Sequence, residues 1–473
     1  MKNYKALFFV LTLIAAASVF AKPREYFVED IFMEYSEAPR ARASQFYKNQ
    51  PEAADAQCLF HNWFNSPHAL GDMGGLRSSL EDFGIVPVIT YLGNFAANPY
   101  GGDRHGAAIS SSVNLGYGVD LQKLFNTDAL KGWSFVNTWV WRFGGSLTKD
   151  YLRNAFSVQQ NYGSQTIRMQ SMYLSYNASF DGDERNRVMF KFGRIAAGDN
   201  FMTKPIYWLY MSNSIDGNPV GVYNQVKFSA YPSAVWGAMG QVSLASGLYF
   251  KAGVYQINSD SQEKNSRHGL DFSFTNGLGV NANFEAGWNI NHDCSGKNPG
   301  NISAGFVADW YTVERLSNPM RHSHFNQTIY FQADYMVWNL GLPDRSAGYV
   351  IDREPHSDSY RDLRGLVLWG ALQYDPSEDL AYMPLFITAG AFFNAPFECR
   401  PDDVLCFGFS YGKFSGKLNA PERNSYEIIL ELNYKLQVNK FFFLQPDMQY
   451  VINTKGGQYP DALVLGLQFG STF

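Results

Sequence analysis

Apolar and polar residues alternate with a period of two along residues 426–436, whose sequence is YEIILELNYKL. The apolar face of this segment consists of Tyr426, Ile428, Leu430, Leu432, Tyr434 and Leu436. The other face carries Glu427, Glu431 and Lys435 and is interrupted by Ile429. This period predicts a β-strand with one apolar and one charged face. In a soluble protein the apolar face would pack a core, whereas in an outer-membrane barrel it would contact lipid and the charges would line a lumen.

The rest of the chain repeats this pattern and favours the barrel. From residue 84 onward, sixteen segments of about ten alternating residues, the length of a transmembrane strand, are each followed by a turn. Their expected starts are Gly84, Ala108, Trp133, Thr166, Arg187, Trp236, Gly247, His268, Val280, Asn301, Asn326, Arg364, Leu385, Tyr426, Phe441 and Ala462. Two further acidic residues, Glu285 and Asp309, lie on polar faces of the same kind, and burying such charges in a dry core is costly. The charged faces are therefore expected to line a water-filled lumen.

The connections between the expected strands alternate between short turns and long loops. Short turns are expected near Ala245 and Val438. The long connections are residues 195–235, 259–267, 342–363 and 398–425. This alternation is typical of an all-β, antiparallel, transmembrane outer-membrane β-barrel with its long loops on the outer side. Sixteen strands enclose an aqueous channel, and an even number leaves both ends of the barrel on the short-turn, periplasmic side.

The N-terminal part carries a signal for export. Residues 1–21 combine a basic start, an apolar run and a small-residue cleavage site, which predicts a secretory signal peptide. Residues 22–57 are expected to form a periplasmic extension and linker. Residues 58–83 are expected to form a short helical segment, and residues 84–473 the barrel.

The C-terminus and the composition indicate the bacterial outer membrane as the location. The last expected strand, residues 462–473, is amphipathic and ends in Phe473, and it resembles the signal by which barrel-assembly machinery recognises its substrates. Aromatic residues make up 16% of the chain, with 38 Phe and 29 Tyr, as expected for girdles that contact outer-membrane lipid and lipopolysaccharide. The net charge of −5 gives no basic patch for nucleic acid.

A motif ahead of the first strand resembles a known family of channels. Residues 66–85, SPHALGDMGGLRSSLEDFGI, contain a Gly-Asp-x-Gly-Gly-x-Arg run, then a Leu and a Gly-Ile pair. This resembles the opening signature of the carbohydrate-selective porins of the OprB type, with Met73 where that family usually has Trp. The matching positions are Gly71, Asp72, Gly74, Gly75, Arg77, Leu80, Gly84 and Ile85. Other segments similar to the family, in order and spacing, are residues 98–102, 192–201, 231–237, 284–288 and 444–453.

The resemblance implies a sixteen-stranded sugar channel that is narrowed by an inward-folded loop. The longest expected loop, residues 195–235, is the candidate, and its Tyr207, Trp208 and Tyr210 would stack on the C–H faces of sugars. The charged residues that would pair with sugar hydroxyls are Arg194, Asp199, Glu285 and Asp309. The other expected pore-lining residues are Arg142, Arg168, Glu427, Glu431 and Lys435. The alternative for the three aromatic residues is that they attach the loop to the barrel wall.

No catalytic residue, cofactor or metal is expected. Residues 408–412, GFSYG, match the nucleophile-elbow pattern, but they lie in an expected loop and not between a strand and a helix. His322 and His324 offer two imidazoles without an evident third ligand.

The four cysteines predict one local disulfide. Cys399 and Cys406 fall within one expected outer loop of an oxidising compartment, which favours a bond between them. Cys58 and Cys294 are expected on opposite sides of the membrane, so no bond between these two is predicted.

Competing functions remain open at this stage. The main alternative to a sugar channel is a general or anion-preferring outer-membrane porin, which the mixed signs of the inward charges do not favour. A barrel enzyme would need a convergent catalytic set near one rim, and a soluble sugar-binding protein would not remain with the membrane. The sugar is not named by the sequence, and a homotrimer is compatible with it.

Overall fold

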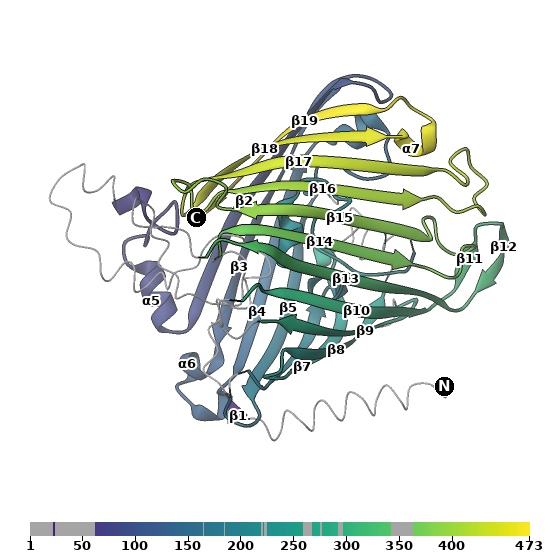
Figure 1. Cartoon of the computed structure of the whole chain (residues 1–473). Coiled ribbons are helices and arrows are strands. Elements are labelled where there is room, and N and C mark those ends of the chain that lie inside the picture. Colours follow the sequence, from purple (N-terminus) through teal and green to yellow (C-terminus); the bar gives the residue numbers. More distant parts are fainter. Residues whose placement is uncertain are drawn as a thin grey trace.

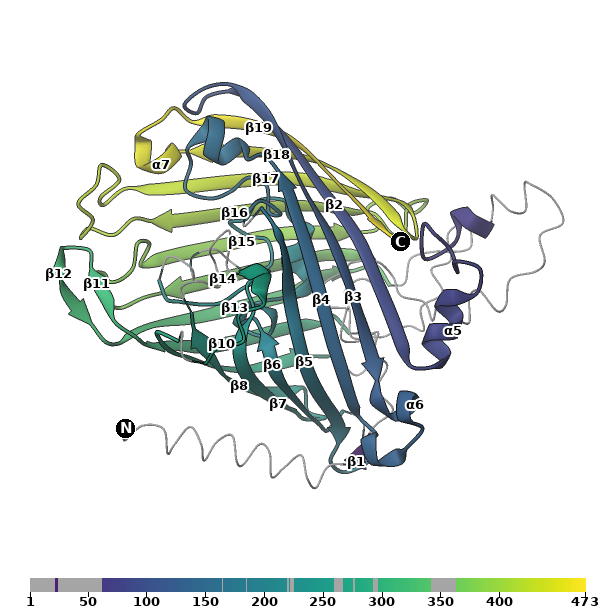
Figure 2. The same cartoon turned by 180° about the vertical axis from the view of Figure 1, so that it is seen from behind.

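Sixteen antiparallel strands, counted within the described residues, close into a barrel (Figure 1 and Figure 2). The computed structural model describes residues 22–23 and 62–473, except 164, 184, 219–220, 222–224, 259–266, 275–276, 292–296 and 342–362. The barrel strands are β2 (Ile85–Tyr100), β3 (Gly106–Asp120), β4 (Trp133–Gly144), β5 (Ile167–Ser179), β6 (Arg187–Ile195), β7 (Val235–Ser243), β8 (Leu248–Ile257), β9 (Gly279–Ile290), β10 (Gly300–Trp310), β13 (Asn326–Asn339), β14 (Gly365–Tyr374), β15 (Leu385–Asn394), β16 (Val404–Lys413), β17 (Tyr426–Asn439), β18 (Phe442–Ile452) and β19 (Ala462–Thr472). Each strand pairs with the next along the barrel, and β19 pairs with β2. The expected sixteen-stranded antiparallel barrel is confirmed.

Short elements lie at the two ends of the barrel. At one end, called the turn end, are the C-terminus, α5 (Leu76–Asp82) and α6 (Leu121–Phe125); at the other, the loop end, are α7 (Thr454–Gly457) and the hairpin of β11 and β12 (Figure 1). The remaining short elements are β1 (Lys22–Pro23), β11 (Val313–Arg315), β12 (Asn318–Ser323), η1 (Asp128–Leu130), η2 (Thr148–Leu152), η3 (Ala197–Asp199), η4 (Pro205–Leu209) and η7 (Arg267–Gly269). Within the described residues, no helix is long and apolar enough to cross a membrane. The expected signal peptide lies outside the described residues, as does the 22–57 extension apart from β1.

The orientation of the strand faces agrees with the alternating sequence pattern. In β17 the side chain of Leu432 is 43% exposed on the outside of the barrel, whereas Glu427 and Glu431 turn inward and are 0% and 1% exposed. Leu432 pairs with Met448, which pairs in turn with Leu465, and all three are exposed. The outer surface is therefore apolar and the lumen wall is polar.

One expected strand is absent from the structure. The segment expected to begin at His268 forms η7 followed by irregular chain. Its alternating Phe272 and Phe274 instead contact Trp236 of β7, whose side chain lies on the outer side of the barrel, and the ring of Phe274 stacks on Trp236 with 4.7 Å between centroids. The alternation at this segment therefore comes from packing on an outer face and not from strand pairing.

One strand was missed, and it restores the expected count. β16 falls within the segment 398–425 that was expected to be a loop, and GFSYG lies inside this strand and not in a turn. Its inward positions are Cys406, Gly408, Ser410 and Gly412, all small residues. An inner face made of small residues does not stand out as polar or apolar, so the strand pattern was weak.

The two errors inverted part of the expected topology. Because antiparallel strands alternate in direction, an extra strand near His268 reverses every later strand until the missing β16 compensates. The end of β13 at Asn339 and the start of β14 at Gly365 therefore lie at the turn end and not at the loop end. The expected outer loop of residues 342–363 lies, apart from its last residue, outside the described residues.

The motif ahead of β2 fastens the two ends of the barrel together. Gly74 and Gly75 have φ of 71° and 92°, a left-handed conformation that favours glycine. Arg77 of α5 is 1% exposed and donates to the backbone oxygen of Phe473 at 2.7 Å and to that of Pro87 at 3.3 Å. Arg77 thereby links the segment before the barrel to its first and last strands.

The predicted disulfide is contradicted, because Cys399 and Cys406 are both free thiols. Cys406 is buried on the inner face of β16, whereas Cys399 is exposed in the turn before that strand. This turn is closed by Arg400 and Asp403, whose side chains form two hydrogen bonds of 2.8 Å. Cys58 and Cys294 lie outside the described residues.

Maleimide labelling will distinguish free thiols from a disulfide at this turn. Folded protein kept without reductant should label at Cys399 and stay unlabelled at Cys406, and denaturation should expose both thiols. Peptide mass mapping measures each site, with a sample reduced beforehand as the control. If Cys399 and Cys406 of the denatured protein label only after reduction, the two thiols form the disulfide that the sequence predicted.

A charge on the outer face should damage folding far more than the same charge in the lumen. Leu432→Arg should lower the free energy of unfolding in bilayers by about 2–4 kcal/mol, the cost of an arginine near the midplane. The control is Gln241→Arg on the inner face of β7, where Gln241 is half-buried and bonds to Ser243. Urea titration in liposomes measures both variants. Equal losses would mean that the faces are assigned wrongly.

Candidate functional site: the inner loop and the lumen wall

The connection between β6 and β7, residues 196–234, folds into the barrel and is called the inner loop. Its Phe201 and Phe228 belong to one buried cluster with Tyr255 of β8. Farther along the loop, Ile215 belongs to a second buried cluster with Trp369 of β14. The inner loop therefore crosses the lumen from one part of the wall to another, as expected for a constriction.

A second loop, residues 145–166 between β4 and β5, also enters the lumen and is called the companion loop. Its Phe156 packs edge-on against Phe386 of β15, with 5.3 Å between ring centroids. Gln160 donates its backbone N–H to the carbonyl of Met211 in the inner loop at 2.9 Å. The two loops thus form one hydrogen-bonded unit. The sequence did not indicate the companion loop, whose alternation is weak.

Glycines on the inner wall let the loops approach closely. A Cβ added to Gly408 of β16 would lie 2.5 Å from Ile215 and 2.8 Å from Tyr210 of the inner loop. A Cβ added to Gly466 of β19 would lie 2.4 Å from the terminal methyl of Met211. Larger side chains at these wall positions would displace the inner loop.

Wall carboxylates bind the backbone of the inner loop from β9 and β10. Glu285 of β9 accepts a hydrogen bond of 3.4 Å from the N–H of Met202. Asp309 of β10 accepts from the N–H of Lys227 and, at 2.6 Å, from the amide of Asn281. Hydrogen bonds to a charged acceptor contribute about 1.5–3 kcal/mol each. Both predicted sugar-binding carboxylates therefore hold the loop in place.

The two acidic residues of β17 bind loops in the same way. Glu431 accepts from the N–H groups of Met211 at 2.6 Å and Ser212 at 3.0 Å. Glu427 accepts from Ala155 of the companion loop at 2.9 Å and from Lys455 of the β18–β19 loop at 2.7 Å. All four inward carboxylates expected from the sequence thus face the lumen side of the wall, and each accepts from loop N–H groups. They are called the wall carboxylates.

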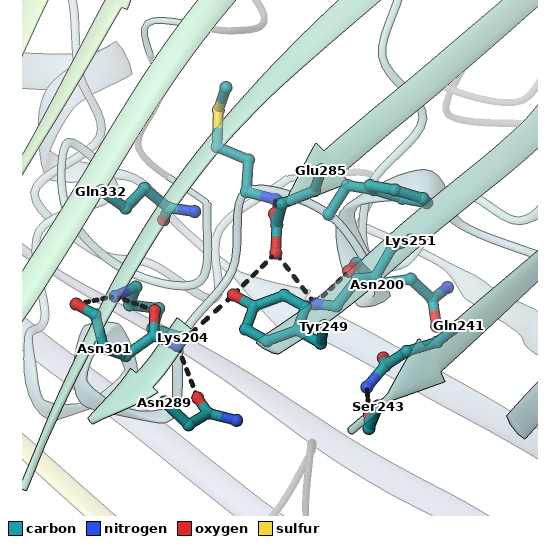
Figure 3. Close-up of polar contacts among 12 residues, drawn as sticks. Asn200, Lys204, Gln241, Ser243, Tyr249, Lys251, Glu285, Asn289, Asn301 and Gln332 are labelled. Atoms are coloured by element: carbon teal, nitrogen blue, oxygen red, sulfur yellow. Dashed lines mark hydrogen bonds and ion pairs between the residues drawn. The ribbon is translucent and has the colours of Figure 1, made fainter. Parts of the chain in front are cut away.

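Figure 3 shows how completely Glu285 is surrounded. Lys251 of β8 forms an ion pair with it at 3.1 Å, and the hydroxyl of Tyr249 donates to it at 3.2 Å. Next to this group, the Nζ of Lys204 from the inner loop donates to Asn301 at 2.8 Å and also pairs with Asp334. This polar network, in which every side chain has a protein partner in the described contacts, fixes the inner loop to β8, β9, β10 and β13.

The three predicted arginines lie on neighbouring strands and contact one stretch of the inner loop. Arg142 of β4 places its guanidinium 4.6 Å from the ring centre of Tyr231. Arg168 of β5 donates to the hydroxyl of Ser233 at 2.8 Å, and Arg194 of β6 donates to a backbone carbonyl one residue later at 2.8 Å. Arg142 and Arg168 therefore lie together on the lumen side. Arg194 instead pairs in register with the outward Trp236, and its guanidinium lies 5.8 Å from the ring centre of Phe272.

The aromatic residues of the inner loop divide into two kinds. Tyr207 and Tyr210 are 0% exposed and pack edge-on against Trp369, with ring centroids 5.4 and 5.3 Å apart. Their hydroxyls are occupied as well, since Tyr207 donates to Gln332 and Tyr210 donates to a wall carbonyl. These two residues attach the loop to the wall, as the alternative held, whereas Trp208 between them stays half-buried.

A half-buried polar surface lies beside the arginines. Tyr231 is half-buried and donates its hydroxyl to Asn114 of β3 at 2.6 Å. Asp199 at the end of η3 is also half-buried and close enough for its charge to act on Tyr231. Sequence reasoning assigned no role to Tyr231 or Asn114. The inward polar position of Asn114 in β3 was the available signal, whereas Tyr231, in an irregular segment, had none beyond the family-like YPSAVWG.

Lys435 is the predicted pore residue that lies farthest toward the turn end of β17. It is buried on the inner face, with its Nζ 4.5 Å from the ring centre of Phe443. The arginines, by contrast, lie near the loop end of their strands. Lys435 is therefore not part of the same surface as Tyr231.

Comparison with known proteins identifies the family. The sequence profile described as carbohydrate-selective porin, OprB family, matches residues 104–473. The chain belongs to this family. Porin B of Pseudomonas aeruginosa is 24% identical over 448 residues, covering 86% of this chain and 92% of the relative. A protein named putative porin QuiX, from Acinetobacter baylyi, is 24% identical over 451 residues, covering 85% and 92%.

A solved structure agrees with the fold. The high-pH structure of OprB from Pseudomonas putida aligns with a TM-score of 0.73 at 21% identity, covering 86% of this chain and 99% of that one. The predicted membership of the OprB family is confirmed by the match over residues 104–473. This porin is an outer-membrane carbohydrate channel, and family and fold are those of a channel and not of an enzyme. Its turn end faces the periplasm and its loop end the exterior.

Removing one wall carboxylate should loosen the inner loop locally. Asp309→Ala leaves the N–H of Lys227 without its acceptor, which costs about 1–3 kcal/mol. Hydrogen exchange at that amide should become roughly tenfold to a hundredfold faster, measured by exchange and mass spectrometry in detergent. Asp183→Ala, in the exposed turn between β5 and β6, is the control. Unchanged exchange would show that Asp309 does not hold the loop.

Proposed function

We propose that carbohydrates diffuse past two half-buried parts of the inner loop, Trp208 on the one hand and Tyr231 with Asp199 on the other, the latter beside Arg142 of β4. This proposal rests on a difference in solvent exposure among the predicted site residues. Tyr207, Tyr210 and the wall carboxylates are buried and bonded to protein, whereas these aromatic and acidic side chains of the loop keep exposed surface. Arg142, though buried, lies directly on the ring of Tyr231.

The chemistry of this surface suits neutral sugars. Sugars present C–H faces that stack on rings such as Trp208 and Tyr231, and hydroxyls that pair with charged groups. Hydrogen bonds to Asp199 and Arg142 would be charge-assisted and roughly twice as strong as neutral ones. Because a channel must also release its solute, few contacts are wanted, and a small surface of this kind fits that demand.

A general or anion-preferring porin is the second candidate function. It is favoured by Arg142 and Arg168, which lie close enough for their charges to act on each other. Both guanidiniums, however, contact the inner loop, and the carboxylate of Asp199 lies near Tyr231. The mixed signs give no strong field for anions.

Two partners beyond the solute belong to this proposal. The outward apolar face of β19 and the terminal Phe473 support recognition by the barrel-assembly machinery during insertion. A homotrimer stays a prediction, since lipid and a second subunit would contact the same apolar outer face. We also infer that solutes pass without covalent chemistry.

Liposome swelling tests the function itself. Vesicles that contain the porin should swell faster in neutral mono- and oligosaccharides than in charged solutes of matched size. The physical reason is the balanced charge along the loop surface. Faster swelling with anionic solutes than with sugars would favour the anion-preferring alternative.

Truncating the exposed ring should weaken sugar passage through specific contact. Trp208→Ala removes stacking surface, so block of the ion current by sugar should weaken several-fold, while single-channel conductance stays equal or rises. Planar-bilayer recording with increasing sugar concentrations measures both quantities.

Tyr207→Phe is the matched control for this experiment. Its ring is buried against Trp369, so sugar block should be unchanged although the hydrogen bond to Gln332 is lost. If the Tyr207 variant weakened sugar block and the Trp208 variant did not, the proposed surface would be wrong.

A further inference from the structure

Four oxygen-bearing side chains form a compact group on the inner wall between β17 and β18. In the strand register Asn433 lies opposite Asp447, and Glu431 lies opposite Gln449. Residues two apart on a strand and directly opposite across a pair share one face, with Cβ atoms about 5 Å apart across the pair. All four side chains point inward and are at most 5% exposed. They are called the oxygen cluster.

The hydrogen bonds of the cluster use all its amide N–H groups. The amide of Asn433 donates to Glu431 and to the carbonyl of Leu209, each at 3.0 Å. The amide of Gln449 donates to Asp447 at 2.9 Å and to the carbonyl of Val158 at 3.0 Å. The donors are therefore fully occupied by the wall, the inner loop and the companion loop.

Three acceptor oxygens of the cluster, by contrast, are reached by no donor in the described part of the chain. They are Oδ1 of Asp447, Oδ1 of Asn433 and Oε1 of Gln449. A buried polar atom without a partner indicates a bound ion or water more often than a true defect. Because all three atoms are acceptors, the missing partner must be positively polarised.

The charges around the cluster also favour a bound cation. Glu431 and Asp447 are close enough to hydrogen-bond to each other, and no ion pair within the described residues involves either of them. Asp216 of the inner loop is a third carboxyl group close to Glu431. Buried carboxylates in proteins are paired or bind metals. Here a cation would supply the missing charge.

We propose that Glu431, Asn433, Asp447 and Gln449 bind one calcium ion beneath the inner loop. Carboxylate and amide oxygens at a site without His or Cys suit Ca²⁺ better than zinc or copper. The two carboxylates balance the ion's charge. Within the described residues no group of three or more His, Cys, Asp or Glu side chains is arranged for a metal; this site instead combines two carboxylates with two amides.

The position of the site gives the ion a structural role. Glu431 also holds the N–H groups of Met211 and Ser212, and Gln449 holds the carbonyl of Val158. A cation between these side chains would fix both lumen loops to β17 and β18. An ion that binds only the folded barrel raises its stability with concentration. This inference does not depend on which solute crosses the channel.

Refolded full-length protein provides the test without lipopolysaccharide, which binds calcium itself. The protein is refolded into detergent after chelation and titrated with Tb³⁺, which reports proximity to excited tyrosine. Tyr210 lies near Glu431 and is a suitable sensitiser. Calcium bound per chain is then measured by elemental mass spectrometry, and the thermal unfolding midpoint is recorded with and without calcium.

The variants separate ion binding from folding. Asp447→Asn removes a ligand charge, and Gln449→Leu removes a carbonyl ligand at constant charge. Each should weaken calcium competition against Tb³⁺ by about tenfold or more, in the range seen when metal-site residues are changed. Glu398→Gln, in the exposed turn that pairs with Arg364, is the control and should bind like the parent protein.

The parent protein should bind one calcium per chain and unfold at a higher temperature when calcium is present. If the parent binds none, and its midpoint responds to pH but not to calcium, the two carboxyl groups share a proton and the proposal is overturned. The proposal is equally overturned if both site variants bind calcium as tightly as the parent. If Asp447→Asn fails to fold, the calcium bound per chain of the parent protein and the calcium competition of Gln449→Leu still test the proposal.

Discussion

The structure depends on carboxylates of the barrel wall that accept hydrogen bonds from the backbone of loops drawn into the lumen. A loop inside a barrel carries N–H groups that water reaches poorly, and an unpaired buried N–H is costly. Glu285, Asp309, Glu427 and Glu431 supply acceptors at four points of the wall. Acidic residues on the inward faces of the strands therefore allow a loop to fold into the lumen.

The remaining features of the lumen make this arrangement possible. Small wall residues such as Gly408 and Gly466 allow the loop backbone to come close enough for these bonds. Tyr207 and Tyr210 then fill the space against Trp369, so the inner loop packs against this part of the wall like a protein interior. The inner loop is thus a fixed part of the fold, held by hydrogen bonds and apolar packing together.

The sequence could predict the faces of the strands but not the contacts of the loops. Alternation with a period of two identified both the outward Leu432 and the inward Glu431, because membrane and lumen demand opposite chemistry on the two faces. The pattern failed where that demand is weak. β16 has only small inward residues under the inner loop. The segment after His268 alternates because its phenylalanines pack against Trp236. Loop contacts such as Arg142 on Tyr231 join residues far apart in the chain, which local periodicity does not encode.

The use of charge in the wall also decides which residues remain for selectivity. A charge that is buried and bonded to the backbone contributes little to recognition, since a solute cannot compete for it without disturbing the loop. The wall carboxylates are occupied in this way, and two of the three arginines bind the hydroxyl and carbonyl groups of residues 233–234. In the proposed passage, the residues left to contact the solute are Trp208, Tyr231, Asp199 and Arg142. Such a surface would carry no large net charge, and it would recognise solutes through their shape and their hydroxyl groups.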